Sequence, residues 1–501
     1  YGVNTYRLID AKDRARLVKF HWKPKLGAHS MTWDEARKLG GIDPDYHRRD
    51  LWDAIERKDY PEFELAIQVI EEEDQDKFPF DPLDATKVWP LQLVPLEPIG
   101  KLVLNRNPDN YFAETEQVAF NPAHLVPGID FSDDPLLQGR LISYLDAQIH
   151  RLGSPNFDEL AINRPKGEID SNRREGQMRQ RIDKGRAAYS PNSLAKGCPM
   201  HAGAKGYGTH PATETGTKTR ARGEKFGDHF GQAQLFWRSQ SEIEQRHIVE
   251  AFVYELSMVD VVDVRRRAVD LLAQVDAKLA GRVADGLGLK IDDAKAAMKR
   301  LEADWKKFGV TAPPGPRRDY DQIKAPELSL EKTAKDTIRT RKIAVLVADG
   351  VEGNQVEAMR SALTAEGAYV EVVAPTLAVI KRADGKTIAP DNSLLTASSV
   401  MYDAIYVPGG PKSVATLKQQ GRAIHFINEA YSHYKTIAAT DEGIDLLLAS
   451  GIGAKDEAEL LKTAGVVGSR KAGDTKKVAK EFASAIAAHR HWEREVERVP
   501  A

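Results

Sequence analysis

The feature that most constrains this sequence is a set of short apolar runs alternating with longer amphipathic stretches in its C-terminal third. Four runs have the length and composition of buried strands, at residues 342–348, 369–374, 404–407 and 436–439. The stretch between the first two has the apolar spacing of a helix over residues 354–366. Strands that alternate with helices form parallel sheets with both faces covered. The pattern therefore predicts a doubly wound α/β domain over residues 339–501.

The first 165 residues have a different periodicity. Two sets of apolar residues alternate with polar ones: Val18, Phe20 and Trp22, and Phe63, Leu65, Ile67 and Val69. A period of two predicts half-buried antiparallel strands, with Lys19, His21 and Lys23 on the opposite face from the first set. A short helix is predicted at residues 51–59. The frequent prolines of residues 78–135 predict a wrapping segment rather than regular structure.

A helical region is predicted in the middle of the chain, over residues 226–310. Ser241 and Glu244 have the spacing of a capping box, which marks the start of a helix. Apolar residues then recur at helical intervals, and further helical patterns continue to about Lys307.

Two segments without a core of their own flank this helical region. Residues 166–225 are rich in Gly, Arg, Lys and Ser and poor in large apolar residues, which predicts an extended arm. Residues 311–338 are polar and begin with three prolines, Pro313, Pro314 and Pro316, which predicts a linker.

Positive and negative charges nearly balance in the 501 residues, with 72 Lys and Arg against 74 Asp and Glu. No overall field attracts nucleic acid or an anionic membrane, so neither is expected as a partner. No apolar run approaches the roughly 20 residues needed to cross a bilayer. A strand-like run at residues 2–9 directly follows Tyr1, so we expect that the natural polypeptide has further residues before it.

Cys198 is the single cysteine of the chain, which excludes an intramolecular disulfide and suits a cytoplasmic protein. His201 and His210 lie nearby and raise the question of a metal site. Because the ligands are too few and there is no second cluster, we expect no zinc and an ordinary thiol at Cys198.

The stretch that carries chemistry is LLQGRLISYLDAQIHRLG, residues 136–153. Its residues Arg140, Tyr144, Gln148 and Arg151 share one face of a helix. An Fe(III) ion and a guanidinium one turn away would both favour the phenolate of Tyr144, and an anionic oxygen ligand donates charge to iron. On spacing alone, packing in a core is the commoner explanation of such a pattern.

Longer matches favour iron binding, because this helix and its surroundings resemble monofunctional haem catalases. Besides RLISYLDAQIHRLG, the matching stretches are VKFHWKP (18–24), DPDYHRRDLWDAIE (43–56), VLNRNPDNYF (103–112), VPGIDFSDDPLLQGR (126–140), SPNFDELAINRP (154–165) and SQSEIEQRHIVEAF (239–252). The resemblance implies a homotetrameric enzyme that converts hydrogen peroxide to water and dioxygen with haem, either b or d. The C-terminal extension is similar to that of the large-subunit class.

The resemblance also implies an α+β fold. Residues 1–165 would form the remainder of an antiparallel β-barrel core, with the wrapping segment and the proximal haem helix. The arm, helical domain and linker would follow, and residues 339–501 would form a flavodoxin-like domain.

The same resemblance assigns roles to individual residues. Tyr144 corresponds to the axial haem ligand, Arg140 to its charge partner and Arg151 to a contact of a haem propionate. Four further residues match positions that line the haem: Phe120, Leu136, Ser143 and Gln148.

Two departures from the family pattern concern the cofactors. Asn121 stands where some relatives have a histidine joined covalently to the axial tyrosine, so this crosslink is not expected. Leu91 replaces a histidine associated with nicotinamide nucleotide binding, and the large-subunit class does not use that cofactor. We therefore expect no NADPH.

The distal histidine and asparagine of catalases are absent from the sequence, and we expect them before Tyr1. A distal histidine moves a proton between the two peroxide oxygens. His21, His29 and His47 are predicted to be structural or surface residues. A catalytically silent haem-holding protein is therefore the alternative function.

The C-terminal domain resembles the amidotransferase and intracellular-protease superfamily, whose nucleophilic cysteine lies at a strand-to-helix turn. In the matching stretch TIAATDEG, Asp441 takes the cysteine position and Glu442 the following histidine position. This excludes cysteine chemistry and disfavours an amidase or deglycase. The glycines of VPGGP (407–411) are predicted to form a structural turn rather than an anion site. We expect the domain to serve stability, assembly or substrate access.

Overall fold

The computed structural model describes residues 1–167, 175–183, 185–187, 192–194, 209–212, 217, 219, 223–290, 293–310, 320–333, 335–471, 473–497 and 499–500. These residues form two compact units. The first contains Tyr1–Leu26, Asp50–Gln240 and Phe252–Leu328, and the second contains Gly27–Arg49, Ser241–Ala251 and Ser329–Ala501. The predictions for Cys198, His201, most of the arm and the three linker prolines concern residues outside this description.

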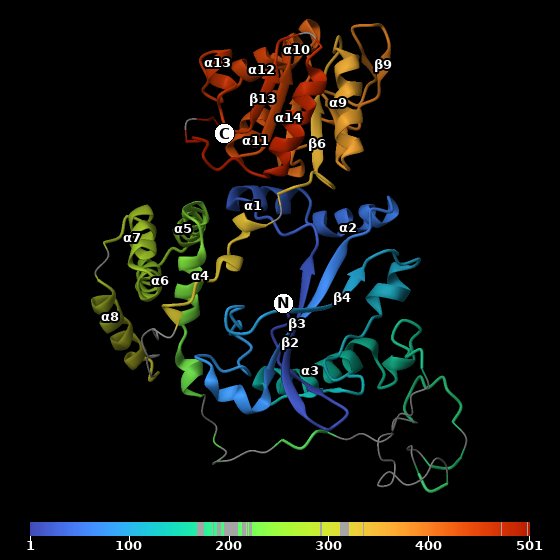
Figure 1. Cartoon of the computed structure of the whole chain (residues 1–501), viewed down its shortest axis with the longest axis vertical. Coiled ribbons are helices and arrows are strands. Elements are labelled where there is room, and N and C mark those ends of the chain that lie inside the picture. Colours follow the sequence, from blue (N-terminus) through green and yellow to red (C-terminus); the bar gives the residue numbers. More distant parts are fainter. Residues whose placement is uncertain are drawn as a thin grey trace. The chain divides into compact units, whose positions relative to one another are not determined.

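The first unit contains a five-stranded antiparallel sheet in the order β4-β3-β2-β1-β5. Figure 1 labels β2, β3 and β4 of this sheet. Its strands are β1 Tyr6–Ile9, β2 Ala15–Pro24, β3 Glu62–Glu71, β4 Glu97–Val103 and β5 Ile129–Phe131. The long β2 and β3 form its centre, with Lys19 opposite Gln68 and His21 opposite Ala66. Antiparallel pairing of these two strands agrees with their alternating sequence.

The centre of β2 is buried on both faces, since Leu17, Val18 and Lys19 are each 0% exposed, whereas its alternation predicts a half-buried strand. Lys19 is 0% exposed and His21 is buried, whereas Trp22 is 45% exposed. The reason is hydrogen bonding within the sheet, since His21 Nε2 lies 2.8 Å from Gln68 Oε1 of β3. Polar side chains can occupy an interior face when hydrogen bonds within the protein replace those to water, although a buried charge still carries an electrostatic cost.

The wrapping segment contains more regular structure than its prolines predict. Both β4 and β5 lie within residues 78–135. Pro98 is accommodated because β4 is an edge strand, where a missing N–H disrupts no central ladder, and the pairing shifts register between Leu65 and Ala66. The helix expected at residues 51–59 is also displaced, since α2 spans Tyr46–Glu56.

The longer helices that follow β5 and precede β6 in the sequence are α3 Pro135–Leu152, α4 Gly231–Ser239, α5 Glu242–Ser257, α6 Val262–Val275, α7 Ala277–Gly286 and α8 Ala294–Lys307. The capping box before α5 is confirmed: Glu244 N donates to Ser241 Oγ, and Ser241 N donates to Glu244 Oε2. Helical turns are η1 Glu72–Lys77, η2 Phe112–Glu116, η3 Phe157–Glu159, η6 Glu224–Gly227, η8 Pro326–Leu328, η9 Leu330–Lys332 and η10 Ser399–Met401.

The second unit contains a six-stranded parallel sheet in the order β10-β7-β6-β11-β12-β13. Its strands are β6 Lys342–Leu346, β7 Tyr369–Ala374, β10 Asn392–Ser393, β11 Ala404–Val407, β12 Thr436–Thr440 and β13 Val466–Ser469. A small hairpin joins β8 Ile380–Lys381 to β9 Thr387–Ile388. The four strands predicted from apolar runs are all present in this sheet.

Helices cover both faces of the parallel sheet (Figure 1). One face packs against α9 Gly353–Ala365 and α14 Thr475–Ala487, and the other against α10 Pro411–Lys418, α11 Gly421–Ser432 and α12 Gly443–Ala449. Along β6, Ile343 and Val345 pack in the core with α9 and α14. Ala344 and Leu346 pack in the core on the other face, with α10, α11 and α12. The unit also contains α1 Trp33–Ile42 and α13 Glu457–Leu460.

Candidate functional site

Helix α3 is fixed at both ends by residues suited to their positions. Asp134 is the N-cap and accepts hydrogen bonds from Leu136 N and Leu137 N at 2.9 and 3.0 Å. Pro135 occupies the first helical position, and Gly153 ends the helix with a φ of 75°. The sequence therefore defines the limits of this helix well.

The cap also ties α3 to the antiparallel sheet. The second carboxylate oxygen of Asp134 accepts from Asn4 Nδ2 at 2.9 Å and from Thr5 N at 3.2 Å, and these two residues directly precede β1. Asp134 is fully buried, so these hydrogen bonds within the protein take the place of hydrogen bonds to water. The face of α3 is thus held in a fixed orientation to β1.

Arg140 and Tyr144 are in direct contact on this helix. Arg140 Nη2 donates to Tyr144 Oη at 3.0 Å, and the guanidinium carbon lies 4.8 Å from the centroid of the tyrosine ring. Arg140 Nη1 also donates to Asn4 Oδ1, which orients the guanidinium. A cation at this distance stabilises negative charge on the phenol oxygen.

The predicted lining residues lie on or beside the same helix face. Leu136 and Ser143 are exposed, and Leu136 presents 52% of its surface. Gln148 is buried, and its Nε2 donates to the backbone oxygen of Phe120 at 3.1 Å. Phe120 itself is 74% exposed. Through this hydrogen bond, Gln148 of α3 holds the segment that contains Phe120.

Arg151 attaches the same segment further along the helix. Its guanidinium donates to the backbone oxygens of Glu116 and Val118, both at 2.6 Å, and to Gln148 Oε1. In these contacts Arg151 holds the chain before Phe120. The predicted contact with a propionate stays a prediction.

These residues suit a flat, largely apolar prosthetic group with an iron centre. A phenol oxygen beside a guanidinium offers one oxygen ligand for iron, and two large apolar side chains of the predicted lining, Phe120 and Leu136, are exposed. A contiguous apolar surface of this kind would mark a place that a ligand or another segment covers.

The three histidines predicted to have no catalytic role occupy different settings. His21 is buried in the sheet, and desolvation lowers its pKa to about 4 although Gln68 partly opposes the shift. His29 lies in the second unit with its ring centroid 4.4 Å from that of His489. His47 is exposed on α2.

Among the residues that the structure describes, no group of three or more His, Cys, Asp and Glu side chains is arranged to hold a metal ion. No described helix is both long and apolar enough to cross a membrane.

Comparisons with known proteins agree along the chain. Residues 1–196 match the family model for catalase, residues 339–496 match the C-terminal domain found in long catalases, and residues 223–287 match the model named catalase-related immune-responsive. The chain is 44% identical to catalase HPII of Mycobacterium avium, with 100% of this chain and 69% of the relative covered. The chain belongs to the catalase family.

Two further relatives support membership of the large-subunit class. Catalase-2 of Bacillus subtilis is 44% identical over 99% of this chain and 68% of the relative. Catalase-1 of Neurospora crassa is 42% identical over 99% of this chain and 67% of the relative. This catalase is therefore a haem enzyme that disproportionates hydrogen peroxide, and a silent haem-holding role is not favoured.

Asn121 has a local structural role in the catalase chain. Its side-chain oxygen accepts from Ala123 N at 2.9 Å, and its backbone oxygen accepts from His124 N at 3.0 Å. This turn follows Phe120 directly. An amide at this position offers no imidazole for a covalent link to the axial tyrosine.

The strand-to-helix turn of the C-terminal domain is built around Asp441. This residue has a φ of 46°, between the end of β12 and the start of α12. Gln355 of α9 donates to Asp441 Oδ2, and Thr440 Oγ1 donates to Gln355 Oε1 at 2.6 Å. Gln355 was not among the predicted site residues, because no feature of the nearby sequence points to a partner 86 residues away.

The two glycines of VPGGP donate to side chains of the same turn. Gly409 N donates to Gln355 Oε1 at 2.8 Å, and Gly410 N donates to Glu442 Oε2 at 3.0 Å. Amides used in this way are not available to an external anion. The arrangement favours the structural turn over an anion site.

Proposed function

We propose that Tyr144 ligates a haem iron through its phenolate oxygen and that Arg140 stabilises the charge on this oxygen. The observation that carries the proposal is the 3.0 Å hydrogen bond from Arg140 Nη2 to Tyr144 Oη, beside exposed Phe120 and Leu136. Four residues would line the haem: Phe120, Leu136, Ser143 and Gln148. Arg151 would meet a propionate, for which a guanidinium is the suitable partner.

Haem supplies the redox chemistry through which one peroxide molecule is oxidised to dioxygen and another is reduced to water. The chain's residues prepare the ligand. Asn4 orients Arg140, and the guanidinium of Arg140 is placed to stabilise negative charge on the phenol oxygen. Gln148 and Arg151 hold the segment before and at Phe120 against α3. Preorganisation of this kind spares the site any rearrangement during turnover.

We also propose the type of each domain, the absence of NADPH, the cellular location and the oligomeric state. The antiparallel sheet would be the remainder of a β-barrel within residues 1–165, followed by an arm (166–225), a helical domain (226–310) and a linker (311–338). The parallel sheet of residues 339–501 would be a flavodoxin-like domain, a proposal that its strand order supports. Leu91 supports a catalase without NADPH. A cytoplasmic homotetramer with haem b or d completes the proposal.

The test is oxygen release from hydrogen peroxide together with haem content, measured for Tyr144→Phe. We expect the variant to lose activity on the order of a hundredfold or more, because a neutral ring cannot donate charge to iron. Tyr369→Phe is the matched control, since it removes one hydroxyl from the other unit and should keep wild-type activity. A Tyr144→Phe protein with wild-type haem content and wild-type oxygen release would contradict the proposal.

A further inference from the structure

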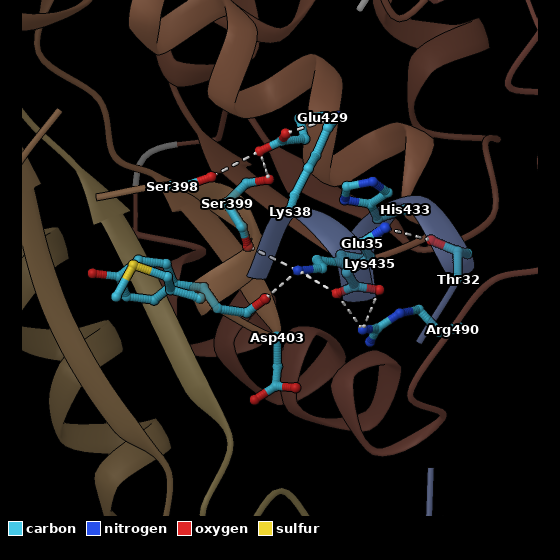
Figure 2. Close-up of polar contacts among 12 residues, drawn as sticks. Thr32, Glu35, Lys38, Ser398, Ser399, Asp403, Glu429, His433, Lys435 and Arg490 are labelled. Atoms are coloured by element: carbon cyan, nitrogen blue, oxygen red, sulfur yellow. Dashed lines mark hydrogen bonds and ion pairs between the residues drawn. The ribbon is translucent and has the colours of Figure 1, made fainter. Parts of the chain in front are cut away.

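Helix α1 belongs to the second unit although it lies between β2 and β3 in the sequence. Its residue Glu35 is buried against two cations, Lys435 and Arg490. We call these three residues the ionic cluster (Figure 2). Buried charges are costly, so a cluster of this kind needs close partners for every charge.

Lys435 has a complete set of acceptors. Its Nζ lies 2.7 Å from Glu35 Oε1 and donates to the backbone oxygens of Ser399 and Tyr402 at 2.8 and 2.7 Å (Figure 2). A neutral amine has only two hydrogens, whereas an ammonium has three. Three acceptors therefore favour the charged form, against the effect of burial, which lowers the pKa of Lys435.

Arg490 approaches the same carboxylate from the segment after α14. Its Nη2 lies 3.0 and 3.3 Å from the two oxygens of Glu35. The two cations outweigh the desolvation of Glu35 and lower its pKa to about 2. Glu35 is thus a charged group in the first turn of α1, where the helix dipole also favours an anion.

Two further contacts flank the ionic cluster on α1. Lys38 Nζ lies 3.3 Å from Glu429 Oε1, and Glu429 also accepts hydrogen bonds from Ser398 and Ser399 (Figure 2). Asp34 Oδ2 lies 2.9 Å from His433 Nε2. The first two turns of α1 are therefore held by side chains from α11 and from the residues that follow it.

His433 is suited to a neutral state. It is 3% exposed, and its Nε2–H is the donor that the Asp34 carboxylate requires. Its Nδ1 is buried without a hydrogen-bond partner among the described residues. Protonation would add an N–H at Nδ1 with no acceptor, which is a costly state in a protein interior.

The charged and titratable groups around His433 come from α1, from α11 and from the segments beside β11, β12 and α14. They are Asp34, Glu35, Lys38, Asp403, His425, Glu429, Lys435 and Arg490. Desolvation is the largest influence, and it lowers the pKa of His433 despite the nearby carboxylates. A histidine freed from the site would recover its ordinary value of about 6.5.

We propose that the ionic cluster, with His433, is an acid-releasable lock that holds α1 on the parallel-sheet domain at neutral pH. Release of α1 exposes His433, which then takes up a proton. Because the released state binds more protons below pH 6.5, falling pH favours release. The contribution of His433 to the holding strength is complete above about pH 6.5 and declines by up to roughly tenfold per pH unit below it.

The first test measures the hydrogen-exchange protection of peptides covering α1 in the full chain, corrected for intrinsic rates. At pH 7.5, Glu35→Gln should lower this protection on the order of a hundredfold, since it leaves two buried cations with a neutral partner. Glu481→Gln is the matched control, because Glu481 forms an exposed pair with Lys477. Equal protection of α1 in wild type and Glu35→Gln would overturn the lock.

A second variant separates the lock from general damage to the fold. The double variant Glu35→Gln/Lys435→Met removes both charges of one pair. Its fold-loss in the protection of α1 should be smaller than the fold-losses of the single variants Glu35→Gln and Lys435→Met multiplied together. Independent, multiplicative effects of the two substitutions would show that the pair does not act together.

The acid response is tested in the wild-type chain, so it does not depend on the folding of a variant. Protection of α1 should fall roughly tenfold between pH 7.5 and pH 5.5. His433→Gln keeps a donor for Asp34 but cannot be protonated, and it should remove most of this fall. His47→Gln, at an exposed histidine of the neighbouring helix, should retain it. Constant wild-type protection, or an undiminished fall in His433→Gln, would overturn acid release.

Discussion

Lys19 is a fully buried cation in the centre of the antiparallel sheet. Its Nζ donates to the backbone oxygens of Val3 and Lys87 at 2.9 and 3.2 Å, and it lies 5.4 Å from the ring centroid of Trp89. Burial lowers its pKa to about 8, although nearby carboxylates oppose the shift. The side chain thus anchors the start of the chain to β2 at an electrostatic cost.

This cost predicts an alkaline gain in stability. Between the pKa of about 8 in the folded protein and about 10.5 in the unfolded chain, the unfolded state binds more protons. The contribution of Lys19 to the free energy of unfolding should therefore rise with pH, by at most about 1.4 kcal/mol per pH unit.

Urea unfolding at pH 8 and pH 10 should show this rise in wild type relative to Lys19→Met. Lys101→Met, at an exposed lysine, should behave as wild type, and a Lys19→Met protein with the wild-type pH dependence would refute the interpretation.

Residue patterns predicted helix α3 well and the burial of the antiparallel sheet less completely. Arg140 and Tyr144 are four residues apart on a helix, so their contact follows from local geometry. Lys19 and Gln68 meet only because β2 pairs with β3 in one register. Alternation shows that a strand has two faces, but it does not show that hydrogen bonds to a neighbouring strand allow the polar face to be buried as well.

At the scale of elements, the start of α3 depends on Asp134. Its carboxylate accepts hydrogen bonds from two helical amides, from Thr5 N and from Asn4. Asp134→Ala should lower the free energy of unfolding by about 2 kcal/mol or more, because an N-cap is worth about 1 kcal/mol and buried donors lose their partners. Chemical denaturation measures this loss.

Asp134→Asn is the graded control for the cap. It keeps an acceptor oxygen for the helical amides, so its loss of stability should lie between those of wild type and Asp134→Ala. If the alanine variant were as stable as wild type, α3 would not depend on this cap.

The strands of the parallel sheet were easier to predict than those of the antiparallel sheet. β6, β7, β11 and β12 are buried on both faces, so continuous apolar runs mark them. β4 carries Pro98 and Gly100 and is largely exposed, so its sequence has no such mark. Its pairing with β3 depends on partners about thirty to forty residues earlier in the chain.

At the scale of the molecule, α1 shows what a linear sequence conceals. The helix lies in the connection between β2 and β3, yet it packs within the unit of the parallel sheet. Glu35 and Arg490 are 455 residues apart. No periodicity relates such distant residues, and the capping-box spacing of Thr32 and Glu35 would predict a local role for the glutamate. Its carboxylate contacts Lys435 and Arg490 instead.

The function proposed for the whole protein depends on Tyr144 as the ligand of the haem iron. The most direct measurement is the optical spectrum of the ferric protein in the region of the tyrosinate-to-iron charge-transfer band, recorded for wild type, Tyr144→Phe and Tyr369→Phe. We predict that Tyr144→Phe loses this band while Tyr369→Phe keeps it. An unchanged band at unchanged haem content in Tyr144→Phe would contradict the assignment.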